Sequence, residues 1–499
     1  MTHSTEKQAI CMGAGFGGMA AALRLKAMGY QVTLIDKMPL LGGRAQVFQK
    51  DGFSFDAGPT VITAPFLLEE LFSLFSKKME NYLELMPLDL WYRYQFEDGF
   101  TLDYGKSLDN LLSQIRLLNP EDVAGYQKLL SFSDKIYQVG FERLASEPFL
   151  SLLSLLKTLP ALVKLKSYTS VYQLVSSFIK NEKLRRAFTI SPLLVWGNPF
   201  QTTSIYTLIH SLERKWGVHF PRGGTGALVS ALKKLMVEEK ITIHLKTSVK
   251  KIVVNQSHVK GVELSDGRII PADLVVVNGD PAYVYKHMID PIFRKKWTNQ
   301  KIDGLSYSMG LFVLYFGTKK RYPKVAHHTI MLGHTYRELL DEIFRVGTLS
   351  EDISLYIHRP TATDPAMAPL ECDSFYALAP VPNLRSGLNW YETGPIYQEK
   401  LLSMIEDRLL PNLRENLVTS FYMTPKNFQQ DYLSEHGAGF SIAPIFRQSA
   451  YFRFHNQSED IRSLYFVGAG THPGAGLPGV LSSAKVLEKI LKEKKYDGN

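Results

Sequence analysis

The stretch QAICMGAGFGGMAAALRLKAMGYQVTLIDK, Gln8–Lys37, decides the fold. It predicts a short buried strand over 9–12, a glycine-rich turn, a helix over 19–27 and a second strand ending in Asp36. Gly29 stands where a helix commonly ends in a left-handed glycine. A strand, a glycine turn, a helix and a strand in this order indicate the first βαβ unit of a Rossmann-type sheet.

The same stretch predicts a dinucleotide site through its G-x-G-x-x-G motif. Gly13 allows the tight turn, Gly15 lets the backbone approach a pyrophosphate, and Gly18 lets helix and strand pack closely. The helix N-terminus adds free N–H groups for the phosphates, and Asp36 can accept hydrogen bonds from a ribose. The alternative is an ordinary glycine-rich turn. The expected contacts here are Gly13, Ala14, Gly15, Phe16, Gly17, Gly18, Asp36 and Lys37.

The next segments favour FAD over NAD. KMPLLGGRAQ follows the second strand, and its glycine pair lets the loop fold back toward the same phosphates. Arg44 can then offer a charge-assisted fork to them, although a surface arginine is the alternative. FDAGPT, at 55–60, adds another small-residue turn, and FAD is long enough to need these extra contacts. The expected contacts are Gly43, Arg44, Gly58, Pro59 and Thr60.

A later segment is expected to return to the nucleotide. VHFPRGGTGALVSALKKLM, 218–236, predicts a turn into an amphipathic helix, and two strands follow with Asp266-Gly267 as a hairpin turn. The buried run LVVV ends before Asp280. We expect Val249 to face the adenine and Asp280 to lie at the cofactor, with core packing as the alternative for Val249.

The C-terminal stretch GAGTHPGAGLPG, 468–479, has no charged residue and lies between a buried strand and an amphipathic helix. Its bare backbone would lie against a large flat group, and the helix starting near Pro478 would stabilise negative charge on a reduced flavin. The G-x-G-x-x-G at 474–479 is not read as a second nucleotide site, because it does not directly follow its strand. The expected contacts are Gly470, Gly479 and Val480.

Composition agrees with a globular chain of two or three domains: 499 residues, 45% hydrophobic and 21% charged. Cys11 and Cys372 cannot form a disulfide framework, which favours a reducing compartment, and no secretory signal is recognised at the start. The net charge of +9 suits an anionic membrane, nucleic acid or solubility alone. No zinc-finger or RNA-binding pattern is present, so neither nucleic acid nor a metal is expected as a partner.

The blocks GAGFGG, GGRAQVFQKDGFSFDAGPTVIT, NPFQTTSIYTLIHSLERKWGVHFPRGGTGAL and LYFVGAGTHPGAGLPGV resemble bacterial-type phytoene desaturases, flavoproteins of carotenoid synthesis, over nearly the whole chain. The resemblance implies FAD at the N-terminal motif and successive desaturations of 15-cis-phytoene to lycopene or neurosporene. It also implies a cytoplasmic protein held peripherally on the inner face of the cell membrane. Oxygen or a quinone would accept the electrons, and the chain could form a homo-oligomer.

A hydrocarbon substrate calls for a long apolar tunnel. Two segments are candidate linings: 187–212, which contains no Asp, Glu, Lys or Arg, and Tyr307–Gly317. Ordinary core is the alternative for both. Because the flavin would accept hydride, no catalytic residue is assigned; His472 and His328 are the weak candidates. The alternatives are another flavoprotein of the superfamily, such as an isomerase, a saturase or an amine oxidase, or a prenyl carrier without redox chemistry.

The predicted fold class is α/β, with a discontinuous Rossmann-type FAD-binding domain, a mixed-sheet substrate domain and a helical membrane-associated lobe. The FAD-binding domain is expected over 1–70, 218–290 and 455–499, the substrate domain over 71–147 and 291–454, and the lobe over 148–217. Within the lobe, 148–180 contains lysines and leucines without Asp or Glu. It predicts a helix pair lying in a membrane interface, with a buried helical hairpin as the alternative.

Overall fold

The computed structural model describes residues 6–195 and 197–497. Its first layer is a five-stranded parallel sheet in the order β19-β13-β1-β2-β9. Both faces of this sheet are covered, which explains why β1 reads as an unbroken apolar run. Along β1, Ala9 and Cys11 pack into the core on one face, and Ile10 and Met12 into the core on the other. The strands are β1 Gln8–Met12, β2 Gln31–Ile35, β9 Thr242–His244, β13 Leu274–Val277 and β19 Leu464–Phe466.

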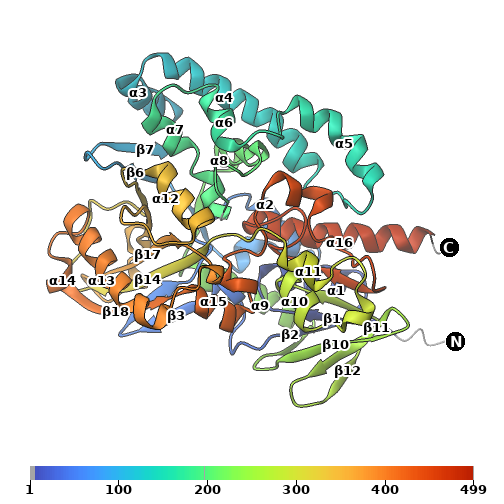
Figure 1. Ribbon diagram of the computed structural model, residues 1–499. Coiled ribbons are helices and arrows are strands. Elements are labelled where there is room, and N and C mark those ends of the chain that lie inside the picture. Colours follow the sequence, from blue (N-terminus) through green and yellow to red (C-terminus); the bar gives the residue numbers. More distant parts are fainter. Residues whose placement is uncertain (1–5, 196, 498–499) are drawn as a thin grey trace.

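Helices from both ends of the chain cover one face of this sheet. Helix α1, Phe16–Ala27, packs against α16, Leu477–Asp497, and against α9, Thr225–Glu238 (Figure 1). The glycines and alanines of α1 allow this close approach. As a consequence, every residue from 16 to 25 is buried. An antiparallel sheet flanks the layer, with β10 Val249–Asn255, β11 His258–Leu264 and β12 Ile269–Pro271.

The second layer is a seven-stranded mixed sheet in the order β18-β14-β17-β16-β15-β6-β7. All nine residues of β14 are buried, and its side chains alternate between two cores. Phe312, Leu314 and Phe316 pack under the long helix α13, Trp390–Arg408, whereas Leu311 and Val313 face the opposite side. The strands are β6 Leu90–Gln95, β7 Thr101–Gly105, β14 Gly310–Thr318, β15 His328–Met331, β16 Leu355–His358, β17 Asp373–Val381 and β18 Leu417–Met423.

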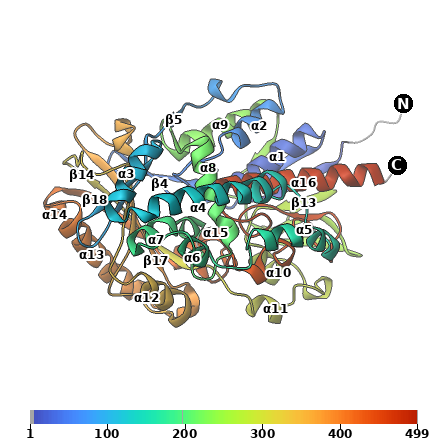
Figure 2. The same cartoon turned by 90° about the horizontal axis from the view of Figure 1, so that it is seen from above.

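A layer of helices lies over both sheets (Figure 2). This layer begins at Leu108 with α3, and α4 belongs to it because α4 packs against α8. The predicted boundary at 148 instead assigns α3 and α4 to the substrate domain. None of the described helices is long and apolar enough to cross a bilayer. The helices are α3 Leu108–Leu118, α4 Glu121–Tyr137, α5 Leu152–Lys164, α6 Val171–Ser176, α7 Glu182–Phe188 and α8 Leu208–Trp216.

The segment 148–180 differs from the expected pair of exposed helices. Helix α5 does expose an apolar face, with Leu153 at 61% and Leu156 at 53% exposure. Helix α6, in contrast, is capped by Ser170 and buries three of its six residues. Leu162, also on α5, is buried, whereas leucines of this segment would be exposed in the expected helix pair; the side chain of Leu155 lies outside the described residues.

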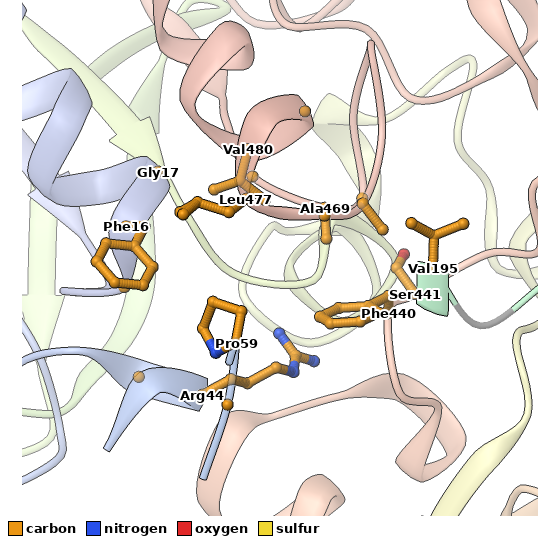
Figure 3. Close-up of a pocket in the computed structure, with 18 of the residues that line it drawn as sticks. Phe16, Gly17, Arg44, Pro59, Val195, Phe440, Ser441, Ala469, Leu477 and Val480 are labelled. Atoms are coloured by element: carbon orange, nitrogen blue, oxygen red, sulfur yellow. The ribbon is translucent and has the colours of Figure 1, made fainter. Parts of the chain in front are cut away.

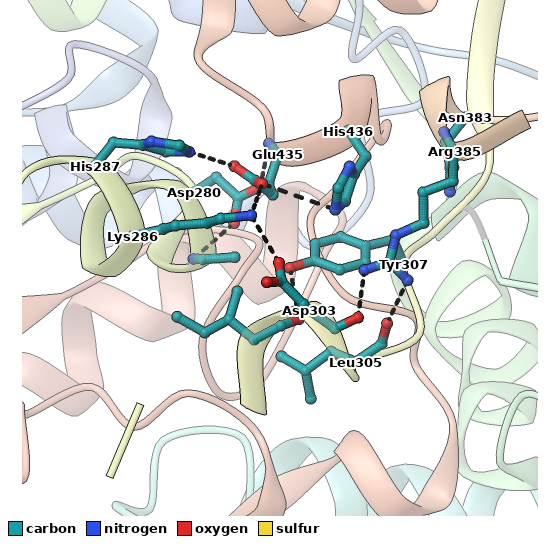
Figure 4. A network of polar contacts seen from close by, with 12 residues as sticks. Asp280, Lys286, His287, Asp303, Leu305, Tyr307, Asn383, Arg385, Glu435 and His436 are labelled. Carbon is teal, nitrogen blue, oxygen red and sulfur yellow. Dashed lines mark hydrogen bonds and ion pairs between the residues drawn. The ribbon is translucent and has the colours of Figure 1, made fainter. Parts of the chain in front are cut away.

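A polar network ties the two sheet layers together (Figure 4). Lys286, on α10 Pro281–His287, pairs with Asp303 at 2.6 Å and with the buried Glu435 at 3.1 Å. The backbone N–H of Glu435 donates to Asp280 at 2.9 Å. Arg385 donates to the carbonyl oxygen of Asp303 at 2.7 Å and packs over Tyr307. Asp280 therefore joins the nucleotide layer to loops of the substrate layer.

Candidate cofactor and substrate site

One large cavity, of about 560 Å³, runs between the parallel sheet, the mixed sheet and the helical layer. Its walls come from the glycine turn before α1, the loop around Arg44, the stretch 468–480, the helices of residues 190–213 and strand β14. One end is built from backbone and polar side chains, and the other from apolar side chains. We call these the glycine end and the apolar arm.

The glycine turn brings backbone close to the cavity. Gly13 has φ +95° and connects β1 to the helix, and a side chain at Gly18 would clash with the carbonyl oxygen of Gly13. Gly15 and Gly17 line the cavity, and Asn278 packs against both of them. Gly15 is the N-cap of α1, and none of the described side chains caps this helix, so its first N–H groups are available to an anion.

Two residues of the predicted set, Ala14 and Gly18, do not line the cavity. Ala14 is buried, and its N–H donates to Oδ2 of Asp36 at 2.6 Å, while Gly18 lets α1 pack under the turn. They support the glycine end from behind. Asn278, in turn, is a lining residue outside the predicted set. Its position directly after the buried strand β13 was the available signal.

Asp36 and Lys37 lie at the far edge of the glycine end, with Val249 nearby on β10. The carboxylate of Asp36 accepts from the N–H of Ala14 and from the N–H of Met38 at 2.8 Å. Burial raises the pKa of Asp36, and these two donors oppose the rise. The carboxylate is thus held in place at the end of β2, with lone pairs left for a ribose.

Arg44 reaches into the cavity without a carboxylate partner among the described residues (Figure 3). Its NH2 group donates to the hydroxyl of Ser434 at 3.3 Å, its guanidinium packs over Tyr432 and Phe440, and its Nε is buried without a partner. Burial lowers the pKa of Arg44, and the charge of Asp280 opposes this. A half-buried arginine whose buried Nε–H has no partner among the described residues fits a diphosphate anion.

The C-terminal stretch lies beside the N-terminal turn, with Val480 next to Gly17, and borders the same cavity (Figure 3). Gly470, Gly479 and Val480 all line it, as do Gly58, Pro59 and Thr60 on the opposite wall. A side chain at Gly17 would approach Val480 to 3.1 Å. Helix α16 begins at Leu477 in the wall, so two helix N-termini reach the same cavity. This uncharged backbone and the free donors of Arg44 fit FAD.

The apolar arm is formed by both predicted linings. From the first come Ile190, Leu193, Leu194, Val195, Ile205, Leu208 and Leu212; Trp196 lies outside the described residues. From Tyr307–Gly317 only Met309, Leu311 and Val313 line the cavity. The alternate residues of β14 point into the core, because successive side chains of a strand face opposite ways. Most of this predicted lining therefore does not border the cavity.

The wall also holds polar side chains outside the predicted set, namely Glu213, Tyr356 and Tyr376. Glu213 is 3% exposed, accepts from the hydroxyl of Tyr92 at 2.8 Å, and has its pKa raised by burial to about 7. The hydroxyl of Thr60 lies 2.9 Å from that of Tyr356 and 2.8 Å from that of Tyr376. Both tyrosines come from strands of the mixed sheet, which carry no recognisable motif.

The model of the flavin containing amine oxidoreductase family matches residues 16–486. The chain belongs to this family. It is also 47% identical to a lycopene-forming phytoene desaturase of Pseudescherichia vulneris, over 98% of this chain and 99% of the relative. A neurosporene-forming phytoene desaturase of Cereibacter sphaeroides is 40% identical, over 98% and 95%.

The resemblance to bacterial-type phytoene desaturases is confirmed by these relatives, and the chain is an FAD-dependent oxidoreductase. A solved oxidoreductase from Methanosarcina mazei shares the fold, with a TM-score of 0.66 and 16% identity over 97% of this chain and 100% of that chain. The family match and this shared fold confirm the expected α/β fold with mixed sheets, whereas the discontinuous FAD-binding domain and contact of the helical layer with a membrane stay predictions.

The two histidines considered for this flavin-containing oxidoreductase lie differently. His472 lines the cavity, its Nε2–H donates to the carbonyl oxygen of Leu144 at 3.0 Å, and burial lowers its pKa to about 4. It is therefore neutral near pH 7, with Nδ1 as its acceptor. His328 does not line the cavity and reaches it only through the hydroxyl of Tyr356, 2.7 Å from its Nδ1.

Proposed function

We propose that this flavoenzyme desaturates 15-cis-phytoene in successive steps and forms lycopene or neurosporene. The observation that carries the proposal is the continuity of the cavity: an apolar arm adjoins a glycine end that fits FAD. Relatives at 47% and 40% identity over nearly the whole chain bear the names of lycopene-forming and neurosporene-forming phytoene desaturases. A hydrocarbon offers no polar handle, so shape and burial of apolar surface must hold it.

FAD, when bound, supplies the hydride acceptor for carbon–carbon desaturation. The chain has three tasks around it. The glycine end binds and orients the cofactor, and the apolar arm holds the polyene and excludes water. A proton must also leave the carbon next to the oxidised one, and neutral Nδ1 of His472 is a basic atom in the wall that can take it.

The proposed location is the cytoplasmic surface of an anionic membrane, where such a hydrocarbon dissolves. Helix α5 supports this. Leu153, Leu156 and Val163 are each more than half exposed on it, while Leu162 of the same helix lines the cavity. Lys157 and Lys164 are exposed beside them, as expected for a helix at the headgroups. The helix would thus join the bilayer to the apolar arm.

Electrons would leave the enzyme to oxygen or a quinone. The sequence has one nucleotide motif of the Rossmann type that directly follows its strand, Gly13–Gly18, and FAD fits there. Desaturation should therefore need no nicotinamide. Turnover that depends on added NAD⁺, with oxygen and quinone excluded, would contradict this.

The proposal is tested with purified protein, FAD and anionic liposomes that contain phytoene, with products separated by chromatography. We expect products with longer conjugated systems, and consumption of one two-electron acceptor per double bond formed. An isomerase would change the double-bond geometry without consuming an acceptor. Phytoene that stays unchanged while an amine reduces the flavin would reject desaturation in favour of amine oxidation.

A further inference from the structure

Three histidines meet in the core of the mixed sheet, outside the cavity. His328 begins β15 and His327 directly precedes it, and the antiparallel register places His328 opposite His358 at the end of β16. They are only 6%, 0% and 0% exposed. One ring nitrogen of each lies within 4.8 Å of one from each of the other two.

In two of these rings, the Nδ1 atom already has a hydrogen-bond partner. Nδ1 of His327 lies 2.6 Å from the hydroxyl of Thr363, and Nδ1 of His328 lies 2.7 Å from that of Tyr356. The Nε2 atoms of both, and both nitrogens of His358, are buried without a hydrogen-bond partner among the described residues. Buried polar atoms are rarely left so, and a shared ligand would give a partner to one nitrogen of each ring, three of these four.

A carboxylate adjoins the three histidines. Oδ2 of Asp56 lies 3.7 Å from Nε2 of His358 and also has no hydrogen-bond partner among the described residues, while Oδ1 accepts from the N–H of Thr225 at 2.9 Å. Asp56 is fully buried. A cation at the histidines would compensate a buried negative charge here.

We propose that His327, His328 and His358 bind one divalent transition metal ion of the zinc class, with Asp56 beside it. Imidazole nitrogens suit this class of ion, and ligating histidines usually hold a hydrogen-bond partner at their second nitrogen. Tetrahedral binding requires neighbouring nitrogens to be about 3.3 Å apart, so small ring rotations must draw the group together. Burial lowers the pKa of all three histidines, which keeps them in the neutral, ligating form.

Such an ion would set the hydrogen bonds of the cavity wall and would take no part in electron transfer. With Nε2 of His328 on the ion, its Nδ1 must carry the proton and donate to Tyr356. The hydroxyl of Tyr356 is then free to donate to Thr60, 2.9 Å away, which lines the cavity. The ion would therefore fix the direction of the hydrogen bonds that border the substrate space.

The test uses full-length holoenzyme prepared without a polyhistidine tag and dialysed against metal-free buffer. We expect about one zinc-class ion per chain by elemental mass spectrometry. His328→Asn and His358→Asn should reduce this to about a tenth or less. The matched control is His244→Asn, which removes an exposed imidazole on β9 and should keep the ion.

A second measurement does not depend on the variants folding. Wild-type protein freed of metal should bind Co²⁺ saturably, with a ligand-field absorption beyond the flavin bands, and its Tm should rise on addition of Zn²⁺. Folded wild type that holds no metal and titrates with neither ion would overturn the proposal. So would metal that persists in both histidine variants, since it would then lie elsewhere.

Discussion

The two ends of the cavity recognise their ligands by different physical means. At the glycine end, main-chain groups approach the ligand, Arg44 supplies charge, and added atoms clash with neighbours such as Asn278. In the apolar arm, side chains of helices and of β14 supply apolar surface, with Glu213 as a buried polar exception. The first end therefore depends on the absence of atoms at fixed positions, whereas the second depends on total volume and tolerates exchange of one apolar residue for another.

The largest effect is expected when atoms are added at the glycine end, which tests whether cofactor binding depends on their absence there. Gly15→Val places a branched side chain where the cofactor diphosphate would lie, and its Cβ would already stand 2.9 Å from the amide nitrogen of Asn278. We expect FAD affinity to fall by more than about 100-fold, or roughly 3 kcal/mol, with the fold retained. Flavin absorbance and circular dichroism of the purified variant check this.

The control for this prediction is Gly304→Ala, at the end of α11, Asn299–Asp303, where the added methyl group meets only ordinary contacts. It should leave flavin content unchanged. A Gly15→Val protein that is purified with stoichiometric FAD would place the diphosphate elsewhere.

The second prediction concerns a polar residue in the apolar arm. Burial raises the pKa of Glu213 from 4.5 to about 7, so the folded protein favours its neutral form. Stability from this group is present below pH 4.5 and is lost as the pH rises through 7. Between pH 5 and pH 8 the wild type should lose on the order of 2 kcal/mol relative to Glu213→Gln.

Denaturant unfolding of the two proteins at both pH values measures this difference. The neutral glutamine keeps the size of the side chain and an acceptor for the hydroxyl of Tyr92. If the difference in the free energy of unfolding does not change with pH, Glu213 is ionised in the fold, and the arm is more polar than its other walls indicate.

The contrast between the two ends also explains what could be read from the sequence. The glycine end is encoded within short segments, because Gly13, Gly18 and Asp36 have one local geometry that permits few other residues. Dinucleotide binding and the Rossmann-type part of the fold followed from it, whereas the family resemblance rested on sequence blocks spread over nearly the whole chain. Tyr356 and Tyr376 carry no such pattern, since strands far apart in the sequence bring them to Thr60.

The orientation of α5 shows the same limit. Its leucines are interrupted by polar residues and predict a helix at a membrane interface, but only the packing decides that Leu162 faces the cavity while Leu156 faces outward. In β14 all nine residues are buried, so its sequence shows no alternation, and the face that borders the substrate space depends on the neighbouring α13.

The third prediction separates charge from shape at the glycine end. Arg44→Gln removes the cation whose Nε has no partner among the described residues, and should weaken FAD binding by about 30-fold, or roughly 2 kcal/mol. Arg44→Lys keeps the charge without the planar fork and should cost about tenfold. Equal losses in both variants would show that the fork alone matters; fluorescence titration of apoprotein with FAD measures both.

The smallest expected effects concern the outer surface of the apolar arm, on α5. Leu156→Ser removes a leucine that is 53% exposed, and should weaken vesicle binding by roughly 1 kcal/mol, about fivefold, on neutral and anionic lipid alike. Lys157→Gln should cost about 1 kcal/mol on anionic lipid at low salt and nothing on neutral lipid.

Leu162 is unsuitable for this test, because its side chain belongs to the cavity wall. Vesicle flotation with Leu370→Ser as control, an exposed leucine far from α5 in the sequence, separates the two contributions. If both α5 variants float like the wild type while folded, the hydrocarbon enters from another face, and the apolar arm opens away from α5.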